Sequence, residues 1–282
     1  MLVQDQTDVF AFLADPSNHA GASHVECIET HISAVFLAGD RAYKLKRAVH
    51  LPYADFSTPE IRLAACEKEF ALNKKTSPEI YVGFRPIFLK HNQLTFEPTD
   101  QLVDAVVEMR RFDQKDILDH IAVQGNLTVE MIGPLAQEIV RAHRDAPSVE
   151  EDGVANIQGV LDINRAGFDE SQAFPNDDVE RLDAAFRSRL QFLEPILERR
   201  ASRGSIKRCH GDLHLRNICM YNGRPQLFDC IDFNDQLATV DVLYDLSFLA
   251  MDLWHRGLHE MANLVVNFYL DRTDEEDGFA CM

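Results

Sequence analysis

The sequence predicts an α+β protein in which a strand-rich first part precedes a larger, mostly helical second part. Short segments rich in β-branched and aromatic residues follow one another up to Arg111. Beyond that point, apolar residues recur at helical spacing over longer segments. One hairpin, closed by Asn222-Gly223, interrupts the helical part. We expect the two parts to divide near Phe112, into residues 1–112 and 113–282.

Composition limits the class of protein. Of the 282 residues, 46% are hydrophobic and 26% charged, which is typical of a soluble globular protein. No apolar run approaches 18 residues, so we expect no membrane partner. The N-terminus lacks signal-peptide features, and the six cysteines lack Cys-x-x-Cys spacing, which predicts reduced thiols and a cytoplasmic location. The net charge of −18 argues against nucleic acid as a partner and weakly favours cationic substrates.

The first part begins with an expected helix over Thr7–Ala14, capped by Thr7 and ended before Pro16. Strands are predicted over residues 27–37, 41–46, 81–89, 93–96 and 103–111. Because strand side chains alternate, Lys44 and Lys46 share one face of their strand.

A helix is predicted from the Ser57-Thr58-Pro59-Glu60 start to about Lys75. Its apolar stripe is marked by Ile61, Ala65 and Leu72, and Glu69 lies on that stripe. A carboxylate on a buried face needs a partner, either a strand lysine or a neighbouring lysine of the same helix.

The second part is predicted to hold helices over residues 118–123, 129–143, 178–200 and 241–254, with an exposed loop over 148–156. The helix over 178–200 presents Leu182, Phe186, Leu190 and Leu193 on one face, and the helix over 241–254 presents Val242, Leu246, Leu249 and Leu253. His255 and His259 are expected at the surface.

The segment from His210 to Asn217 is the candidate site. After it, the two-residue turn at Asn222-Gly223 pairs Tyr221 with Arg224, which places Asn217 opposite Phe228. Asp229 therefore returns beside Asn217, whereas Asp232 lies three residues further along. The side chains of Asp212, Asn217 and Asp229 thus give the arrangement that phosphoryl transfer needs. One carboxylate orients the attacking hydroxyl, and the amide oxygen and the other carboxylate bind Mg²⁺.

The motif His210-Gly211-Asp212-x-x-x-x-Asn217, followed by Phe228-Asp229, resembles the catalytic loop of aminoglycoside-phosphotransferase-like kinases. More narrowly, residues 228–234 and 241–246 resemble bacterial proteins described as bifunctional aminoglycoside phosphotransferase/ATP-binding proteins. The resemblance extends from about Thr30 to the C-terminus. It implies a bilobal protein-kinase-like fold, with a small β-rich N-lobe and a larger, mostly helical C-lobe.

The resemblance also implies roles in the second part. Asp212 would accept the hydroxyl proton or orient the nucleophile, and His214 would contact the γ-phosphate. Asn217 and Asp229 would hold Mg²⁺, with Asp232 as the alternative to Asp229. His210 and Asp245 would brace the loop, and His143 resembles a structural histidine of the family.

In the first part, the resemblance implies a nucleotide site. Lys44, or alternatively Lys46, would bind the α- and β-phosphates, and Glu69 would pair with Lys44. Thr30 and Ser33 offer hydroxyls to phosphate, although strand positions are the simpler interpretation of both. Backbone at the predicted hinge, Glu108–Arg111 around Met109, would bond adenine.

The function predicted from the resemblance is ATP- and Mg²⁺-dependent transfer of the γ-phosphoryl group to a hydroxyl of a small-molecule acceptor. The acceptor and the oligomeric state are not specified by the sequence. Relatives often continue into a second nucleotide-binding domain, and the Gly-x-x-x-x-Gly-Lys-Ser/Thr motif of such a domain is absent here. We expect that the C-lobe is truncated if the chain is a fragment.

Two other functions fit parts of the pattern. A metal-dependent hydrolase would use His210, Asp212 and His214, which alternate and would converge if this segment were a strand. A nucleotide-binding regulatory module, or a module that transfers AMP, would keep the same fold without phosphoryl transfer.

Overall fold

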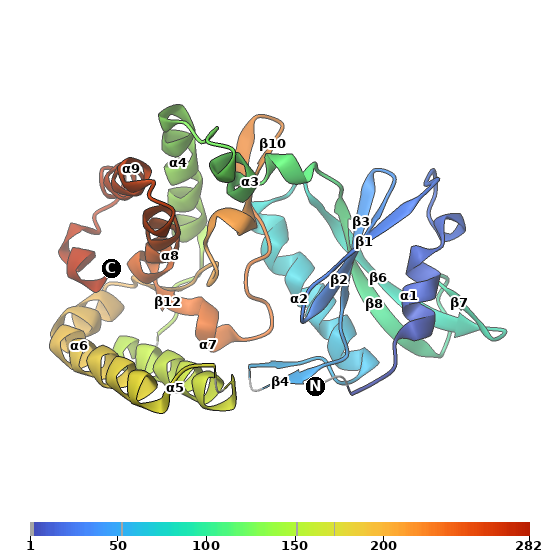
Figure 1. Ribbon diagram of the computed structural model, residues 1–282, viewed down its shortest axis with the longest axis horizontal. Coiled ribbons are helices and arrows are strands. Elements are labelled where there is room, and N and C mark those ends of the chain that lie inside the picture. Colours follow the sequence, from blue (N-terminus) through green and yellow to red (C-terminus); the bar gives the residue numbers. More distant parts are fainter. Residues whose placement is uncertain (1–2, 52, 151, 172) are drawn as a thin grey trace. The chain divides into compact units, whose positions relative to one another are not determined.

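The computed structural model describes residues 3–51, 53–150, 152–171 and 173–282. The chain forms two compact units, Met1–Asp113 and Gln114–Met282, whose elements are labelled in Figure 1. A six-stranded sheet dominates the first unit and helices dominate the second. The predicted α+β class is confirmed.

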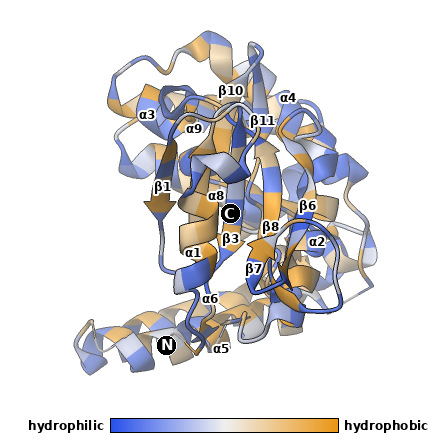
Figure 2. Cartoon of the chain, turned by 90° about the vertical axis from the view of Figure 1, so that its right-hand side faces the viewer, coloured by the Kyte–Doolittle hydropathy of each residue, from blue (hydrophilic) through white to orange (hydrophobic). Residues whose placement is uncertain are grey.

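The sheet of the first unit has the order β1-β2-β3-β8-β6-β7, and all neighbouring strands are antiparallel. β8 lies inside the sheet, is largely buried, and is coloured as hydrophobic over much of its length in Figure 2. A short pair, β4 and β5, follows β3. The strands are β1 (Val25–Glu29), β2 (Ser33–Ala38), β3 (Arg41–Lys46), β4 (His50–Leu51), β5 (Ala54–Asp55), β6 (Tyr81–Lys90), β7 (Gln93–Thr95) and β8 (Leu102–Arg110).

The prediction of one strand over residues 27–37 is wrong, because the chain turns between β1 and β2. Thr30 closes this turn: its N–H donates to the carbonyl of Ser33 at 2.8 Å, and its Oγ1 accepts from Ser33 N at 3.1 Å. Thr30 therefore lies in a turn, while Ser33 begins β2.

Helix α1 (Thr7–Ala14) packs against β1 and β7, and its buried Val9 and Leu13 join the core formed with β2 and β3. The helix has the predicted bounds, but Thr7 is not its cap. Gln6 occupies the N-cap position without a side-chain cap bond, and Asp5 before it accepts at Oδ1 from Thr7 N at 2.9 Å and from Thr7 Oγ1 at 2.6 Å. A 3₁₀ turn (Pro16–Asn18) follows.

Helix α2 (Pro59–Thr76) packs on β6 and β8. Thr58 caps it by accepting from Ile61 N at 3.3 Å, so the predicted start is confirmed. The predicted apolar stripe is wrong, because Ile61 is exposed and the fully buried positions are Arg62, Cys66, Glu69 and Asn73. These polar groups are buried with partners, as when Arg62 Nε contacts Asp104 Oδ1 of β8 at 2.8 Å.

The second unit consists mainly of helices. They are α3 (Leu118–Val123), α4 (Val129–Asp145), α5 (Gly153–Ser171), α6 (Asn176–Ser202), α7 (Asp235–Ala238), α8 (Val242–His255) and α9 (His259–Leu270). Two short antiparallel pairs join β9 (Ile206–Arg208) to β12 (Thr239–Asp241) and β10 (Ile218–Tyr221) to β11 (Arg224–Leu227). Three 3₁₀ turns occupy Gln114–Asp116, Leu215–Asn217 and Glu276–Cys281.

The prediction of an exposed loop over 148–156 is partly wrong, because α5 begins at Gly153 and lies beside α6 (Figure 1). Asp152 starts this helix, since its Oδ1 accepts from Val154 N at 2.9 Å and from Ala155 N at 3.1 Å.

The predicted face of α6 is correct for Leu190 and Leu193, which are buried, and wrong for Leu182 and Phe186, which are exposed. The buried stripe of α6 packs on residues from the first half of α5, namely Val154, Ile157 and Leu161. Hydrophobic and hydrophilic residues are accordingly mixed along α6 in Figure 2.

The predicted stripe of α8 is confirmed: Val242, Leu246, Leu249 and Leu253 are all buried in the main core of the unit, with residues of α4 and α9. The hairpin register is confirmed as well, because Tyr221 pairs with Arg224. Asn222 and Gly223 have φ values of 51° and 75°, as a type I′ turn requires.

No helix among the described residues is long and apolar enough to cross a membrane. All six cysteines carry free thiols.

Candidate active site

The loop from His210 to Asn217 connects β9 to β10 in the second unit. Gly211 has φ +81°, a backbone conformation that glycine adopts without strain. A Cβ at this position would lie 3.1 Å from Ala238 Cα and from Ile231 Cδ1. His210 Nε2 lies 2.9 Å from the carbonyl oxygen of Phe228, so the ring joins the loop to the end of the hairpin. Burial lowers the pKa of His210, which keeps the imidazole neutral with Nε2–H donating to that carbonyl.

Asp245, in the first turn of α8, is fully buried behind the loop. Its Oδ1 accepts from Gly211 N at 2.7 Å, and its Oδ2 accepts from His210 N at 3.3 Å. The same Oδ2 lies 2.9 Å from His143 Nε2 of α4, and His143 Nδ1 lies 2.9 Å from the hydroxyl of Tyr269. Burial raises the pKa of Asp245, but His143 and the neighbouring donors lower it more, so the carboxylate remains charged. Asp245 therefore contacts the loop backbone as predicted, with His143 behind it.

Asp212 is the accessible carboxylate of the loop. Asn217 Nδ2 donates to Asp212 Oδ2 and to the Asp212 carbonyl, both at 2.9 Å, and His214 Nε2 lies 3.3 Å from Asp212 Oδ1. Burial raises the pKa of Asp212, but the contacts with His214 and Asn217 lower it by more, so the pKa lies below its ordinary value. Burial lowers the pKa of His214, but the bond and charge of Asp212 raise it more, to above its ordinary value. The contact between the two side chains therefore favours the charged form of each.

The hairpin returns the second predicted carboxylate to this loop. Phe228 N donates to the carbonyl of Asn217 at 3.0 Å, which is the predicted register. Asp229 follows directly with φ 60° and is half-buried, whereas Asp232 is buried. Both described contacts of the Asn217 side-chain amide use Nδ2 as the donor. Oδ1 is therefore the atom of this amide that is suited to bind a cation. Amide and carboxylate oxygens from Asn217 and Asp229 form a donor set that fits Mg²⁺.

A buried cluster of charges lies in the first unit. Glu69 Oε1 is 2.9 Å from Lys44 Nζ, so the predicted contact is present, and Glu69 Oε2 is 2.5 Å from Lys46 Nζ. The two lysine Nζ atoms therefore contact the two oxygens of one carboxylate. The Lys44 side chain is 10% exposed and that of Lys46 only 1%, so Lys44 is the more accessible. Ser33 is buried opposite Lys46 in the register of β2 and β3.

Met109 lies within β8, opposite Ala42 of β3 and Tyr81 of β6. The strand extends to Arg110, whose N–H donates to the carbonyl of Ile80 at 2.8 Å. The N–H of Arg111 donates to the carbonyl of Asp40 at 2.9 Å. These two backbone donors of the predicted hinge are therefore used within the first unit.

The hydrolase alternative required His210, Asp212 and His214 to converge on one metal, and the structure does not bring them together. Gly211 breaks the strand geometry, and His210 points to a backbone carbonyl while His214 contacts Asp212. Among the described residues, the three-ligand group that does converge is His143, Cys209 and Asp245. It is buried, and the bonds of Asp245 to the loop give it a structural role.

Sequence reasoning missed two supporting acids. Asp252 Oδ2 accepts from Leu215 N at 3.0 Å, which holds the loop from the last turns of α8. Asp119 of α3 lies 3.4 Å from Arg216 Nε. Asp252 was detectable, because it lies seven residues after Asp245 and so on the same face of α8.

The fold is of the protein-kinase-like class. It is similar to choline kinase from Cryptosporidium parvum, with a TM-score of 0.54 and 11% identity over 99% of this chain and 82% of that one. It is also similar to a thermostable mutant of aminoglycoside phosphotransferase APH(4)-Ia, with a TM-score of 0.51 and 13% identity over 97% of this chain and 85% of that one. These likenesses concern the fold.

The family model described as "Phosphotransferase enzyme family" (APH) matches residues 100–277, more than half of the chain. The chain belongs to this family. Uncharacterized proteins of Mycobacterium bovis and Mycobacterium tuberculosis are 28% identical to it over 260 residues, which cover 89% of this chain and 50% of theirs. The chain thus spans about half the length of the curated relatives it matches.

Proposed function

We propose that this phosphotransferase moves the γ-phosphoryl group of ATP to a hydroxyl of a small-molecule acceptor and requires Mg²⁺. One observation supports this most strongly. Asp212 is accessible, bonded to Asn217, and held in a loop whose backbone donates to the buried carboxylate of Asp245. A pre-organised carboxylate of this kind orients a nucleophile without rearranging during the reaction.

In the proposed reaction, the acceptor oxygen forms a bond to the γ-phosphorus as the bond from that phosphorus to the β,γ-bridging oxygen breaks and ADP leaves. The hydroxyl proton passes to Asp212 and then to solvent. Because the pKa of Asp212 lies below its ordinary value, Asp212 is a weak base and acts mainly by orienting the hydroxyl. His214 lies beside it, and its raised pKa favours the protonated imidazole, which suits a contact with the γ-phosphate.

Asn217 and Asp229 are the residues proposed to hold Mg²⁺, with Asp232 as a second carboxylate in the same segment. Bound Mg²⁺ supplies positive charge that neutralises the phosphate oxygens. In the first unit, we propose that Lys44 binds the nucleotide phosphates, that Glu69 positions it, and that the hinge backbone of Glu108–Arg111, around Met109, contacts adenine.

The partners proposed are ATP and the acceptor, without nucleic acid. Four of the six free thiols are buried, which fits a reducing compartment and hence the cytoplasm. The family does not identify the acceptor, since the similar structures are named for choline and aminoglycoside kinases.

Thermal unfolding with ATP plus Mg²⁺, with ATP plus chelator and with Mg²⁺ alone tests the nucleotide site. A ligand that binds only the folded chain raises its apparent stability. We expect ATP and Mg²⁺ together to raise the Tm of the wild type, and the Asp229→Ala variant to lose most of that increase. Equal Tm values in all three conditions for the wild type would refute the proposal.

A further inference from the structure

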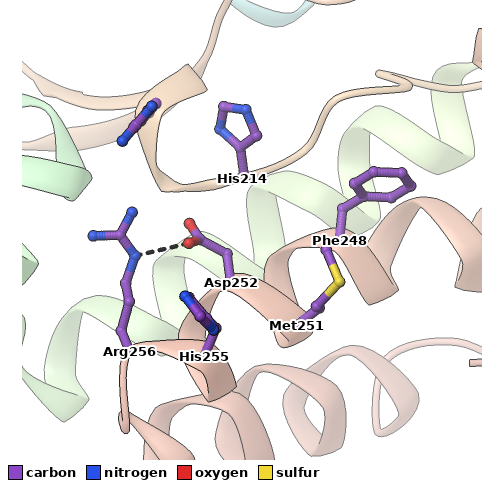
Figure 3. A pocket seen from close by; sticks show the side chains of 7 residues that line it. His214, Phe248, Met251, Asp252, His255 and Arg256 are labelled. Carbon is purple, nitrogen blue, oxygen red and sulfur yellow. Dashed lines mark hydrogen bonds and ion pairs between the residues drawn. The ribbon is translucent and has the colours of Figure 1, made fainter. Parts of the chain in front are cut away.

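A cavity of about 390 Å³ lies next to the catalytic loop in the second unit. Its walls come from the loop, through His214 and Arg216, and from α8 and the residue after it, through Phe248, Met251, Asp252, His255 and Arg256. Figure 3 shows the cavity and labels all of these residues except Arg216. Its volume falls within the range of small-molecule sites. Because His214 both lines the cavity and contacts Asp212 at 3.3 Å, a molecule bound there lies one side chain from the proposed catalytic carboxylate.

Two acidic groups at the cavity, Asp252 in its wall and Asp119 beside Arg216, are covered and already paired. Asp252 Oδ1 lies 2.7 Å from Arg256 Nε, an ion pair drawn in Figure 3, and Asp252 Oδ2 accepts from Leu215 N. Asp119 Oδ1 lies 2.5 Å from Arg256 Nη2. The Asp119 and Asp252 side chains are only 15% and 17% exposed, so neither presents a free carboxylate to a ligand.

The accessible charge of the cavity is instead positive. Arg216 has a side chain that is 74% exposed, and its one ion pair among the described residues is a 3.4 Å contact through Nε with Asp119. Among the described contacts of Arg216, none uses the two terminal nitrogens of its guanidinium, and such a pair of nitrogens suits a bidentate anion. The cavity is also lined by Phe248 and the exposed Met251, which supply the apolar part of its wall.

We propose that this cavity is the acceptor site and that the acceptor carries an anionic group, bound by Arg216, next to an apolar portion packed on Phe248 and Met251. The assignment as acceptor site rests on the proposed phosphotransferase function. An anionic acceptor is not what the net charge of −18 suggests, since that charge by itself favours cationic substrates. Polycationic acceptors are therefore poor ligands of this cavity, because Arg216 repels them.

The test compares three hydroxyl compounds of similar shape and different charge: mandelate, mandelamide and 2-amino-1-phenylethanol. Phenyl phosphate, as a fourth probe, distinguishes phosphate from carboxylate as the preferred anion. Each is titrated without nucleotide into the full chain carrying ¹³C-methyl methionine, and the Met251 methyl shift reports occupancy of the cavity. Calorimetry gives the Kd for the wild type and for the Arg216→Ala, Arg216→Lys and Arg224→Ala variants. Arg224 is an exposed arginine of β11, in the hairpin that follows the loop; it does not line the cavity and is the matched control.

We expect at least one of the two anions to shift the Met251 methyl and to bind about tenfold more tightly than mandelamide, with the amine weakest. Loss of one charged hydrogen-bonding group should weaken anion binding about tenfold in Arg216→Ala. Arg216→Lys should restore part of the affinity, and Arg224→Ala should match the wild type. Tighter binding of the amine, no shift at Met251 with any probe, or equal anion affinity in Arg216→Ala would overturn the inference.

Stabilisation of Arg216→Ala by ATP and Mg²⁺ separates the two proposals. If that variant keeps the nucleotide effect while anion binding fails in the wild type, the acceptor assignment is wrong and the phosphotransferase proposal stands. If ATP and Mg²⁺ do not stabilise even the wild type, the proposed function is wrong and the acceptor assignment falls with it.

Discussion

Replacing Asp245 by asparagine removes the charge that holds the catalytic loop. The carboxylate accepts three hydrogen bonds, from Gly211 N at 2.7 Å, His143 Nε2 at 2.9 Å and His210 N at 3.3 Å. An amide keeps one acceptor oxygen and turns an N–H₂ group toward at least one of these donors. Weakening charged hydrogen bonds and leaving a buried donor unpaired should lower the free energy of unfolding by about 3–5 kcal/mol.

The assay is urea unfolding followed by fluorescence of Trp254, the single tryptophan, which lies on α8 itself. The matched control is Asp162→Asn, which removes a carboxylate from the exposed ion pair with Arg187. We expect this control to unfold with the wild type, because exposed pairs contribute little. A loss below about 1 kcal/mol for Asp245→Asn would refute the argument that Asp245 braces the loop.

Three further predictions concern the two charged clusters and the loop backbone. The pKa of His214, followed by NMR, should lie above 6.5 and should fall in Asp212→Asn; an unchanged pKa would contradict the ion pair. Because a raised folded pKa stabilises the fold below the unfolded value, the contribution of His214 to stability should be lost as pH rises through its folded pKa. Lys44→Met should weaken the binding of ATP with Mg²⁺ about tenfold or more. Lys46→Met, at the more buried of the two lysines, should chiefly lower the Tm. The reverse pattern would show that Lys46 binds the phosphates. Gly211→Ala should lower the free energy of unfolding by about 1–3 kcal/mol in the Trp254 assay, because φ is +81° and the added Cβ has contacts at 3.1 Å. An unchanged free energy of unfolding would show that the loop can relax.

Features set by local rules were predictable from the sequence. The Asn222-Gly223 turn determined the hairpin register, and strand alternation placed Lys44 and Lys46 on one face. Helical spacing placed the buried apolar residues of α8 correctly, and the family resemblance implied the contact of Asp245 with the loop.

Features that depend on distant partners were not predictable. The buried face of α2 is polar because Arg62 meets Asp104, 42 residues away, and no local pattern marks such a pair. The same holds for Arg200 of α6, which is buried against Asp241 at the start of α8 with Nε–Oδ2 at 2.6 Å. α5 was missed because it has as many polar as apolar positions, and the apolar residues that pack on α6, Val154, Ile157 and Leu161, all lie in its first half.

The most direct test of the central claim is ³¹P NMR of ATP with Mg²⁺, incubated with the wild type or with Asp212→Asn in the presence of candidate hydroxyl acceptors. We predict loss of the γ-phosphate signal, formation of ADP and a new phosphomonoester with the wild type, and a rate at least about a hundredfold lower with Asp212→Asn. Equal rates for the two proteins, or no phosphomonoester with any acceptor despite binding of ATP and Mg²⁺, would contradict a phosphotransferase that acts through Asp212.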